Sequence, residues 1–505
     1  MKKIVLPAIA GLLLSLSFPN TFIPFVYIGG FFLIFYTIQK SRTLKEALLS
    51  VFIAGFSFSI FSFYWIIFAV THYGDVNTAV AVLMFFVFAS AFSAVQFVPF
   101  GAGMYYLRRY RYAFYLAPFI WVFLEVFREF FPFTGFPWNL VGYTLTYINP
   151  VAQIAYFGGI YIISFLAVFL AVSVYQFFME RGVLSTGVFL ISLVIFTGIF
   201  IWGKHRINSY TDTGTPKNVA VIQGNITEDI KMDESSRLDI INKYLFLMKK
   251  AAEYDVDLIV LPESAIPIYP LYKPAGVYSV YFFENLRDIK KPIISGFDNV
   301  FYKNDRIFLY NSVFLIDPSG KPVDYYSKIK LVPFGEYVPF PFDFLRKLFP
   351  YLEGYDFYFG EEKKILRYDG FKVVPLVCFE AIFPVFVADF SRKGNLLVNL
   401  TNDAWFGKTS APFQHFEMAR VRAIENNMYL VRAANTGISA IINPVGVPVS
   451  TLNLFEEGII LDRVYLRTEG SFWNRHYLLT GIIFTGSFAG LLLIIIKTRN
   501  RRSRP

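Results

Sequence analysis

Nearly continuous apolar runs, separated by short polar breaks, fill the first 203 residues of this 505-residue chain. A helix of roughly 20 apolar residues crosses a hydrocarbon core about 30 Å thick. The apolar surface of so many runs is more than one soluble core can bury, and this predicts a multi-pass membrane protein. The composition agrees, since 55% of the residues are hydrophobic and the mean hydropathy is +0.48. We expect membrane spans over 4–19, 22–39, 46–70, 78–104, 112–131, 150–178, 183–203 and 478–496.

Basic residues occur in alternate connections between these runs, whereas Ser17–Asn20 and Thr71–Thr78 contain no Lys or Arg. Cytoplasmic connections of membrane proteins carry an excess of Lys and Arg, so the basic connections and both termini are expected to be cytoplasmic. These anchors also explain much of the net charge of +10 without a nucleic-acid partner. The anchors are Lys2, Lys3, Lys40, Arg42, Lys45, Arg108, Arg109, Arg111, Arg181 and the segment 497–504.

The pattern changes after residue 215 to short strand-like runs that alternate with amphipathic helices. This alternation predicts an α/β domain in which helices cover a central sheet or a pair of sheets. The chain then divides into a seven-helix transmembrane domain over 1–203, an extracytoplasmic globular domain over 215–465, a transmembrane helix over 476–497 and a cytoplasmic tail over 498–505. Strands are expected near 218–224, 257–261, 292–297, 307–316, 322–327, 372–377, 394–400 and 429–443. Helices are expected near 233–254, 277–288, 381–392 and 412–427.

Cys378 is the only cysteine of the chain, and it stands between the strand 372–377 and the helix 381–392. Backbone N–H groups at such a turn can lower a thiol pKa and bind an oxyanion. Glu263 follows the strand 257–261, and Lys328 follows the strand 322–327. Taken singly, these residues could be a buried thiol, a turn carboxylate and a solvated amine. Together, at three strand ends, they predict a nucleophile, a base and a cation of one active site.

Three segments resemble the nitrilase, or carbon–nitrogen hydrolase, superfamily: 261–264, 326–336 and 376–380. The segments 399–407 and 414–423, the seven spans before the globular domain and the single span after it extend this resemblance. With them, the whole chain resembles the apolipoprotein N-acyltransferase family of bacterial inner membranes. The resemblance implies a multi-pass α-helical membrane domain of about eight transmembrane helices, joined to an α-β-β-α sandwich. The sandwich would lie on the periplasmic side.

The resemblance also implies a ping-pong reaction at Glu263, Lys328 and Cys378. A phospholipid, with phosphatidylethanolamine expected, would donate a fatty acyl chain to the Cys378 thiol. The amine of a diacylglyceryl-cysteine apolipoprotein would then accept it. Glu263 would be the general base, and Lys328 and the Phe379 N–H would stabilise the oxyanion. Glu336 and Glu380 would orient Lys328 and influence Glu263 by their charge.

Strongly apolar segments of the globular domain are candidates for lipid contact, because apolar loops can enter a bilayer surface. The alternative is that they are ordinary core. The candidates are Phe340, Phe342 and Phe344 of the loop 339–351, with Trp405 and, in the membrane domain, Trp138 of the segment 135–138. A lateral opening of the active site, rimmed by these elements, would spare the acyl chain from entering water. Two departures from the family pattern affect the lid: Met232 replaces a Trp, and Phe379 replaces a Tyr.

Several other functions have weaker support. One cysteine and four histidines offer no zinc-ligand spacing, and no phosphate-binding glycine loop is present, so no metal or cofactor is expected. A Cys–His dyad could use only His415, for which helix capping is the favoured role. A membrane-tethered amidohydrolase would use the same triad with water as acceptor. A transporter or scaffold with a degenerate domain would need ionisable residues within spans, for which Glu125 and Arg128 are the main candidates.

The first prediction concerns topology. Single cysteines introduced into a Cys378→Ala background should react with an impermeant reagent added outside when they lie within 204–475. A cysteine near Arg501 should react only after the membrane is permeabilised. Labelling of the latter site from outside would contradict the assigned orientation.

Overall fold

The computed structural model describes residues 2–74, 76–110, 112–272, 275–303, 306–347 and 356–479, with six further positions between 481 and 490. The chain divides into two compact units, residues 1–209 with 476–505 and residues 210–475. Arg111, positions 348–351 of the aromatic loop, most of the expected helix 476–497 and all of the tail 498–505 lie outside the described residues.

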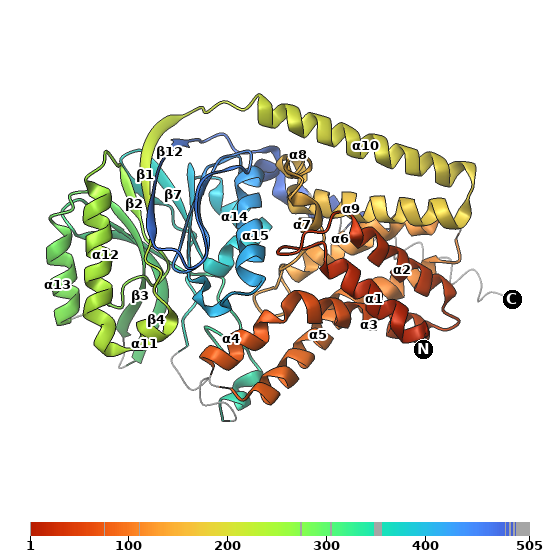
Figure 1. Ribbon diagram of the computed structural model, residues 1–505, viewed down its shortest axis with the longest axis horizontal. Coiled ribbons are helices and arrows are strands. Elements are labelled where there is room, and N and C mark those ends of the chain that lie inside the picture. The colour runs from red at the N-terminus through yellow and green to blue at the C-terminus, as the bar shows by residue number, and fades with distance from the viewer. Residues whose placement is uncertain are drawn as a thin grey trace. The chain divides into compact units, whose positions relative to one another are not determined.

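In its described residues, the first unit consists of helices and connecting segments, without strands (Figure 1). Four of its helices, α3, α5, α9 and α10, are long and apolar enough to cross a membrane by length and composition; among the described residues no other helix is. The number of spans therefore stays a prediction. Its helices are α1 Lys2–Ser15, α2 Val26–Lys40, α3 Leu44–Phe63, α4 Trp65–Tyr73, α5 Thr78–Leu107, α6 Ala117–Arg128, α7 Tyr143–Thr146, α8 Asn149–Ala152, α9 Ala155–Glu180 and α10 Val183–Asn208.

Several expected spans are shorter or broken in the structure. The run 46–70 is interrupted at Tyr64, which separates α3 from α4, and the run 112–131 contains an α-helix of only 12 residues, α6. Within the run 150–178, Gly158 and Gly159 have non-helical dihedral angles and kink α9. Hydropathy alone could not place these breaks, because the residues on both sides of each break are equally apolar.

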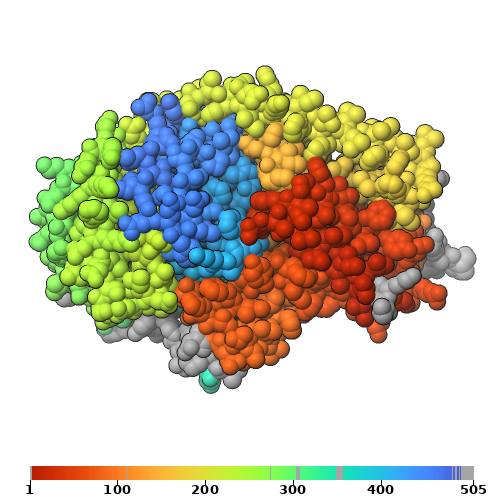
Figure 2. Space-filling view, viewed as in Figure 1, coloured from red at the N-terminus to blue at the C-terminus, as the bar shows by residue number. Residues whose placement is uncertain are grey.

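Helices α9 and α10 differ in how they are covered. In α9, 72% of the most apolar stretch is buried, whereas in α10 only 11% is. Figure 2 shows α10 as a yellow band of exposed atoms on the surface of the first unit. A helix with so much uncovered apolar surface is suited to contact with lipid.

Two charged residues of α6 are buried in the first unit and serve its packing. Glu125 Oε1 accepts hydrogen bonds from Trp121 Nε1 at 2.9 Å and from the Val141 N–H at 2.6 Å. Arg128 Nη2 donates to the Trp138 carbonyl at 3.1 Å, and its guanidinium lies 4.7 Å from the Phe92 ring centroid. These contacts tie α6 to the segment that follows it, which explains the charges without a transport function.

The second unit is a sandwich of two six-stranded sheets, which confirms the expected fold class. The first has the order β12-β1-β2-β3-β4-β5 and the second β11-β10-β9-β8-β7-β6. Helices α12 Arg237–Ala252 and α13 Val277–Leu286 cover the first sheet, and α14 Pro384–Ser391 and α15 Ala411–Asn426 cover the second (Figure 1). The strands are β1 Thr215–Gln223, β2 Leu258–Val260, β3 Ile293–Lys303, β4 Arg306–Ile316, β5 Pro322–Ser327, β6 Leu366–Tyr368, β7 Phe371–Val377, β8 Leu396–Thr401, β9 Leu430–Ala434, β10 Ser439–Ile442, β11 Pro448–Leu452 and β12 Gly458–Leu466.

The strand predictions were mostly right, with three corrections. The segment 429–443 forms two antiparallel strands, β9 and β10, rather than one. The chain after Cys378 first forms a short 3-10 helix, η5 Cys378–Ile382, and the α-helix begins only at Pro384. Strands β6, β11 and β12 were not predicted, since they are edge strands or partly exposed and lack a continuous apolar run.

Parallel pairing brings the carboxyl ends of neighbouring strands to the same edge of each sheet. β1, β2 and β3 run parallel in the first sheet, as do β7, β8 and β9 in the second. The backbone of Gly296 in β3 packs against the residue that follows β2: a Cβ at this position would lie 2.6 Å from the Glu263 Cα. A hydrogen bond of 3.1 Å from the Gly296 N–H to the Pro262 carbonyl holds the same contact.

Gly296→Ala should therefore displace the Glu263 loop, because the Cβ meets backbone atoms that cannot move aside. We expect a loss of about 1–3 kcal/mol in the free energy of unfolding, as for other overpacked sites, together with a lower catalytic rate. Thermal unfolding and activity of the purified protein check this. Gly276→Ala is the matched control, because a Cβ there meets no atom within 4 Å; equal effects of the two changes would contradict the interpretation.

Candidate active site

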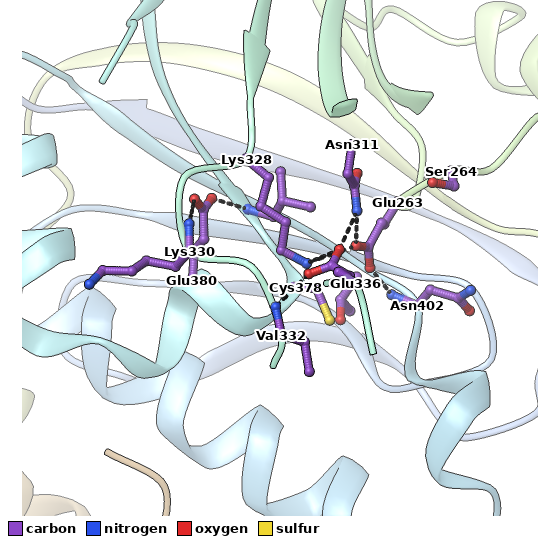
Figure 3. A network of polar contacts seen from close by, with 12 residues as sticks. Glu263, Ser264, Asn311, Lys328, Lys330, Val332, Glu336, Cys378, Glu380 and Asn402 are labelled. Carbon is purple, nitrogen blue, oxygen red and sulfur yellow. Dashed lines mark hydrogen bonds and ion pairs between the residues drawn. The ribbon is translucent and has the colours of Figure 1, made fainter. Parts of the chain in front are cut away.

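Glu263, Lys328 and Cys378 meet between the two sheets of the second unit. Glu263 and Lys328 follow β2 and β5 of the first sheet, and Cys378 follows β7 of the second. Lys328 Nζ lies 3.4 Å from Glu263 Oε1. Figure 3 shows the Cys378 sulfur beside the carboxylates of this group. The fold thus joins three residues that are separated by up to 115 positions in the chain.

Cys378 has a left-handed backbone, with φ of 47°, and it is the first residue of η5. Its side chain is partly exposed. Burial of the sulfur raises the pKa of Cys378 above its usual value, and the charge of Glu263 raises it further, while Lys328 opposes the rise. This differs from the expected lowering of the thiol pKa at a helix start. The protonated thiol is therefore the favoured form of Cys378 near neutral pH.

Lys328 is a buried ammonium held by two carboxylates. Its Nζ donates to Glu336 Oε1 at 2.8 Å and lies near Glu263, and only 1% of its side chain is exposed. Burial alone would lower the pKa of Lys328, but the charges of Glu336 and Glu263 outweigh burial and raise the pKa above its usual value. The amine is therefore a permanent cation beside the thiol.

Asn311 of β4 is a site residue that the sequence did not reveal. Its Nδ2 donates to Glu263 Oε1 at 2.7 Å and to Glu336 Oε1 at 3.0 Å. The backbone contributes as well, because the Asn402 N–H donates to Glu263 Oε2 and the Val332 N–H to Glu336 Oε2. These donors hold two carboxylates close together and fix the Glu263 side chain. Asn311 lies within an apolar strand, where its polarity was the only available signal.

Glu380 supports the site through the backbone rather than through Lys328. Its Oε1 accepts from the Tyr326 hydroxyl at 2.7 Å and from the N–H groups of Ile329 and Lys330, and its Oε2 accepts from the Val377 N–H at 2.8 Å. The side chain is fully buried, and burial raises the pKa of Glu380 despite these donors. Glu380 thus connects the end of β7 to the loop that carries Lys328.

The ring of His415 contacts the backbone of Cys378 and not its sulfur. Nε2 lies 3.1 Å from the Cys378 carbonyl oxygen, and Nδ1 lies 2.8 Å from Asp403 Oδ1. The expected capping role is wrong, since His415 lies within α15 and is fully buried. Nδ1 also lies 3.3 Å from Arg432 Nη2. These contacts of the two ring nitrogens are with groups other than the thiol, which is the partner that a Cys–His dyad would require.

The candidates for lipid contact separate into exposed and buried residues. Phe340 is 86% exposed and Phe344 57%, and Phe342 packs 5.6 Å from the Phe334 ring centroid. Trp405 is also exposed. Trp138 is only 2% exposed, because it stacks on Trp65 and Phe136, so its side chain is a packing element of the first unit.

The two departures from the family pattern occupy different environments. Met232 ends the short helix α11 Glu228–Met232 and is exposed. Phe379 is buried, and its ring meets that of Phe383 edge to face at 5.0 Å. Among the described residues no group of three His, Cys, Asp or Glu side chains could hold a metal ion.

Two family models match the sequence: the apolipoprotein N-acyltransferase N-terminal domain over residues 10–173, and carbon–nitrogen hydrolase over residues 218–472. The apolipoprotein N-acyltransferase of Aquifex aeolicus is 34% identical over 463 residues, which cover 91% of this chain and 98% of that protein. The Geobacter metallireducens protein of the same name is 34% identical, with 94% and 91% covered. An amidase structure from Nesterenkonia sp. covers 53% of this chain and 96% of its own, at 21% identity and a TM-score of 0.38.

The raised pKa of Cys378 makes a prediction about its reactivity. Alkylation by iodoacetamide should be slow at pH 7 and should accelerate as the pH rises past 9, because only the thiolate reacts. Glu263→Gln removes a negative charge and should shift the curve to lower pH, whereas Lys328→Met removes a positive charge and should shift it to higher pH. Intact-mass spectrometry measures the rate. Fast alkylation that does not change between pH 6 and 9 would contradict the raised pKa.

Proposed function

The chain belongs to the apolipoprotein N-acyltransferase family, and we propose that its reaction, the N-acylation of lipoproteins, proceeds through a thioester on Cys378. The observation that carries this proposal is the buried Lys328 ammonium, held by Glu263 and Glu336 beside a thiol at a strand end. A nucleophile, a base and a fixed cation are the groups that acyl transfer through a thiol requires. The protein is a membrane-embedded bacterial acyltransferase.

In the first half of the reaction, Glu263 removes the Cys378 proton and the sulfur attacks the ester carbonyl of a phospholipid. The tetrahedral oxyanion is stabilised by Lys328 and by the Phe379 N–H in the first turn of η5. Collapse of this intermediate breaks the ester C–O bond. Glu263 returns the proton to the departing lysophospholipid oxygen, which leaves an acyl thioester on Cys378.

In the second half, the α-amine of a diacylglyceryl-cysteine apolipoprotein attacks the thioester carbonyl. Glu263 accepts a proton from the amine, and the same donors stabilise the second oxyanion. Cleavage of the C–S bond forms the amide, and the proton returns to the Cys378 sulfur. The raised pKa of the thiol supports this last step, because a basic thiolate is readily reprotonated.

Phosphatidylethanolamine is the proposed donor, and we place the second unit on the periplasmic side with both termini in the cytoplasm. The alternation of basic connections supports this orientation. The domain limits proposed above, 1–203, 215–465, 476–497 and 498–505, fit the same topology. Transfer of an acyl chain of about sixteen carbons into water would cost about 12 kcal/mol, at roughly 0.8 kcal/mol for each CH₂, so the chain needs an apolar path. The exposed rings of Phe340 and Phe344 support a lipid-facing loop near residue 340 as part of that path.

An amidohydrolase would use the same residues and release free fatty acid, and a non-enzymatic transporter or scaffold would form no adduct. The named relatives favour neither. With a diacylglyceryl peptide present, the proposed reaction yields N-acylated peptide, and hydrolysis yields fatty acid instead. Mass spectrometry of the lipid extract separates these products.

A graded series of substitutions tests the roles of the triad. Cys378→Ala should abolish the acyl adduct seen by intact-mass analysis after incubation with phospholipid. Glu263→Gln should block thioester formation while phospholipid still binds. Lys328→Met should slow thioester formation by about 100-fold or more, as expected when an oxyanion-stabilising group is lost. A wild-type rate in Lys328→Met would overturn the role assigned to the amine.

A further inference from the structure

A second polar cluster lies behind the Cys378 backbone, separate from the triad. It consists of Asp403 at the start of η6 Asp403–Phe406, His415 of α15 and Arg432 of β9, all of which are fully buried. Asp403 Oδ2 accepts from Arg432 Nη2 at 2.7 Å, and Asp403 Oδ1 accepts from the Thr401 hydroxyl at 3.1 Å. The cluster joins the segments 399–407 and 414–423, which the reaction scheme leaves without a role.

The hydrogen-bond partners of His415 determine what its ring does. The carbonyl oxygen of Cys378 can only accept, so Nε2 carries a hydrogen and donates to it at 3.1 Å. Asp403 is an ionised carboxylate, because the charges of Arg432 and His415 outweigh burial and lower its pKa to about 2. Nδ1 lies 2.8 Å from Asp403 Oδ1 and 3.3 Å from Arg432 Nη2. The ring is anchored at one nitrogen and holds the nucleophile's carbonyl with the other.

The carbonyl that His415 holds belongs to a strained residue. Cys378 has φ of 47°, a left-handed conformation that is unfavourable for a non-glycine residue and persists only where surrounding contacts impose it. If Cys378 left this conformation, both its carbonyl and the Cα–Cβ bond that carries the sulfur would point in other directions. Glu380 fixes the residue before Cys378 through the Val377 N–H, and His415 fixes the carbonyl of Cys378 itself.

We propose that His415 is a positioning residue, which keeps the Cys378 backbone left-handed and so directs the sulfur toward the acyl donor. The proposal rests on the proposed function only in taking Cys378 as the nucleophile. His415 touches neither substrate nor sulfur, and it acts through the Cys378 carbonyl.

Two isosteric substitutions separate the two hydrogen bonds of the ring. In His415→Gln the amide group reaches the position of Nε2, so the bond to the Cys378 carbonyl is kept and the bond to Asp403 is lost. In His415→Asn the amide group occupies the position of Nδ1, so the bond to Asp403 is kept and the bond to Cys378 is lost. The pair therefore distinguishes positioning of the nucleophile from simple stabilisation of the buried cluster.

We expect His415→Asn to lower kcat for acyl-enzyme formation from phosphatidylethanolamine by roughly 100-fold, as for a reacting atom displaced by about 1 Å, with little change in KM. His415→Gln should recover most of this loss and remain within about tenfold of wild type. Equal losses in both variants, or a greater loss in Gln than in Asn, would overturn the proposal. Thermal unfolding of each variant reports whether it is folded.

Alkylation of Cys378 by iodoacetamide, followed by intact mass, gives a second measure that needs no acyl donor. At fixed pH, His415→Asn should react more slowly than His415→Gln. If phospholipid acylates none of the proteins, wild type included, while alkylation still separates Asn from Gln, the positioning role stands and the proposed reaction fails. If His415→Asn does not fold, His415→Phe replaces it, because a ring of similar size still packs against Phe406 but makes neither hydrogen bond. Acylation and alkylation rates of His415→Phe that equal those of wild type would overturn the proposal.

Discussion

The catalytic unit depends on one buried cation. An ammonium removed from water is costly unless anions and hydrogen bonds compensate it, and removal of one partner leaves an unpaired charge. Lys328 meets this requirement through Glu336 at 2.8 Å and Glu263 at 3.4 Å. Asn311 also donates to both carboxylates, which helps to hold them close together. The loops after β2 and β5 and the middle of β4 are therefore held in one arrangement, which is also the arrangement that the chemistry needs.

The second sheet is joined to this arrangement by another buried carboxylate. Glu380 binds Tyr326 and the backbone after Lys328 on one side, and the Val377 N–H on the other. Hydrogen bonds across the sandwich thus help to fix the position of Cys378 relative to Glu263. A preorganised site of this kind lowers the cost of reorganising dipoles during the reaction. In the proposed mechanism, the raised pKa of Cys378 keeps the thiol protonated until Glu263 acts.

The membrane unit follows different rules because lipid supplies little hydrophobic drive for helix association. Small residues allow close helix approach instead: a Cβ on Gly11 of α1 would lie 2.1 Å from the Ala54 carbonyl oxygen of α3. Buried polar side chains bond to the backbone, as Glu125 does to the Val141 N–H and Arg128 to the Trp138 carbonyl. The ionisable residues of this unit that first suggested transport thus act in packing.

The sequence by itself determined the class of the protein. Hydropathy separated membrane helices from the α/β domain, strand ends located Glu263, Lys328 and Cys378, and motifs identified the family, because these signals depend on local composition and order. Tertiary structure alone decided how the residues act. The pairing of Asn311 with two carboxylates, the backbone contacts of Glu380, and the link from His415 to the Cys378 carbonyl each join segments far apart in the chain. The breaks at Tyr64 and Gly158 likewise appear only in the structure, because each lies within an apolar run. The tertiary structure also decided the direction in which the pKa of Cys378 shifts, because burial and the charge of Glu263 act through space and not along the sequence.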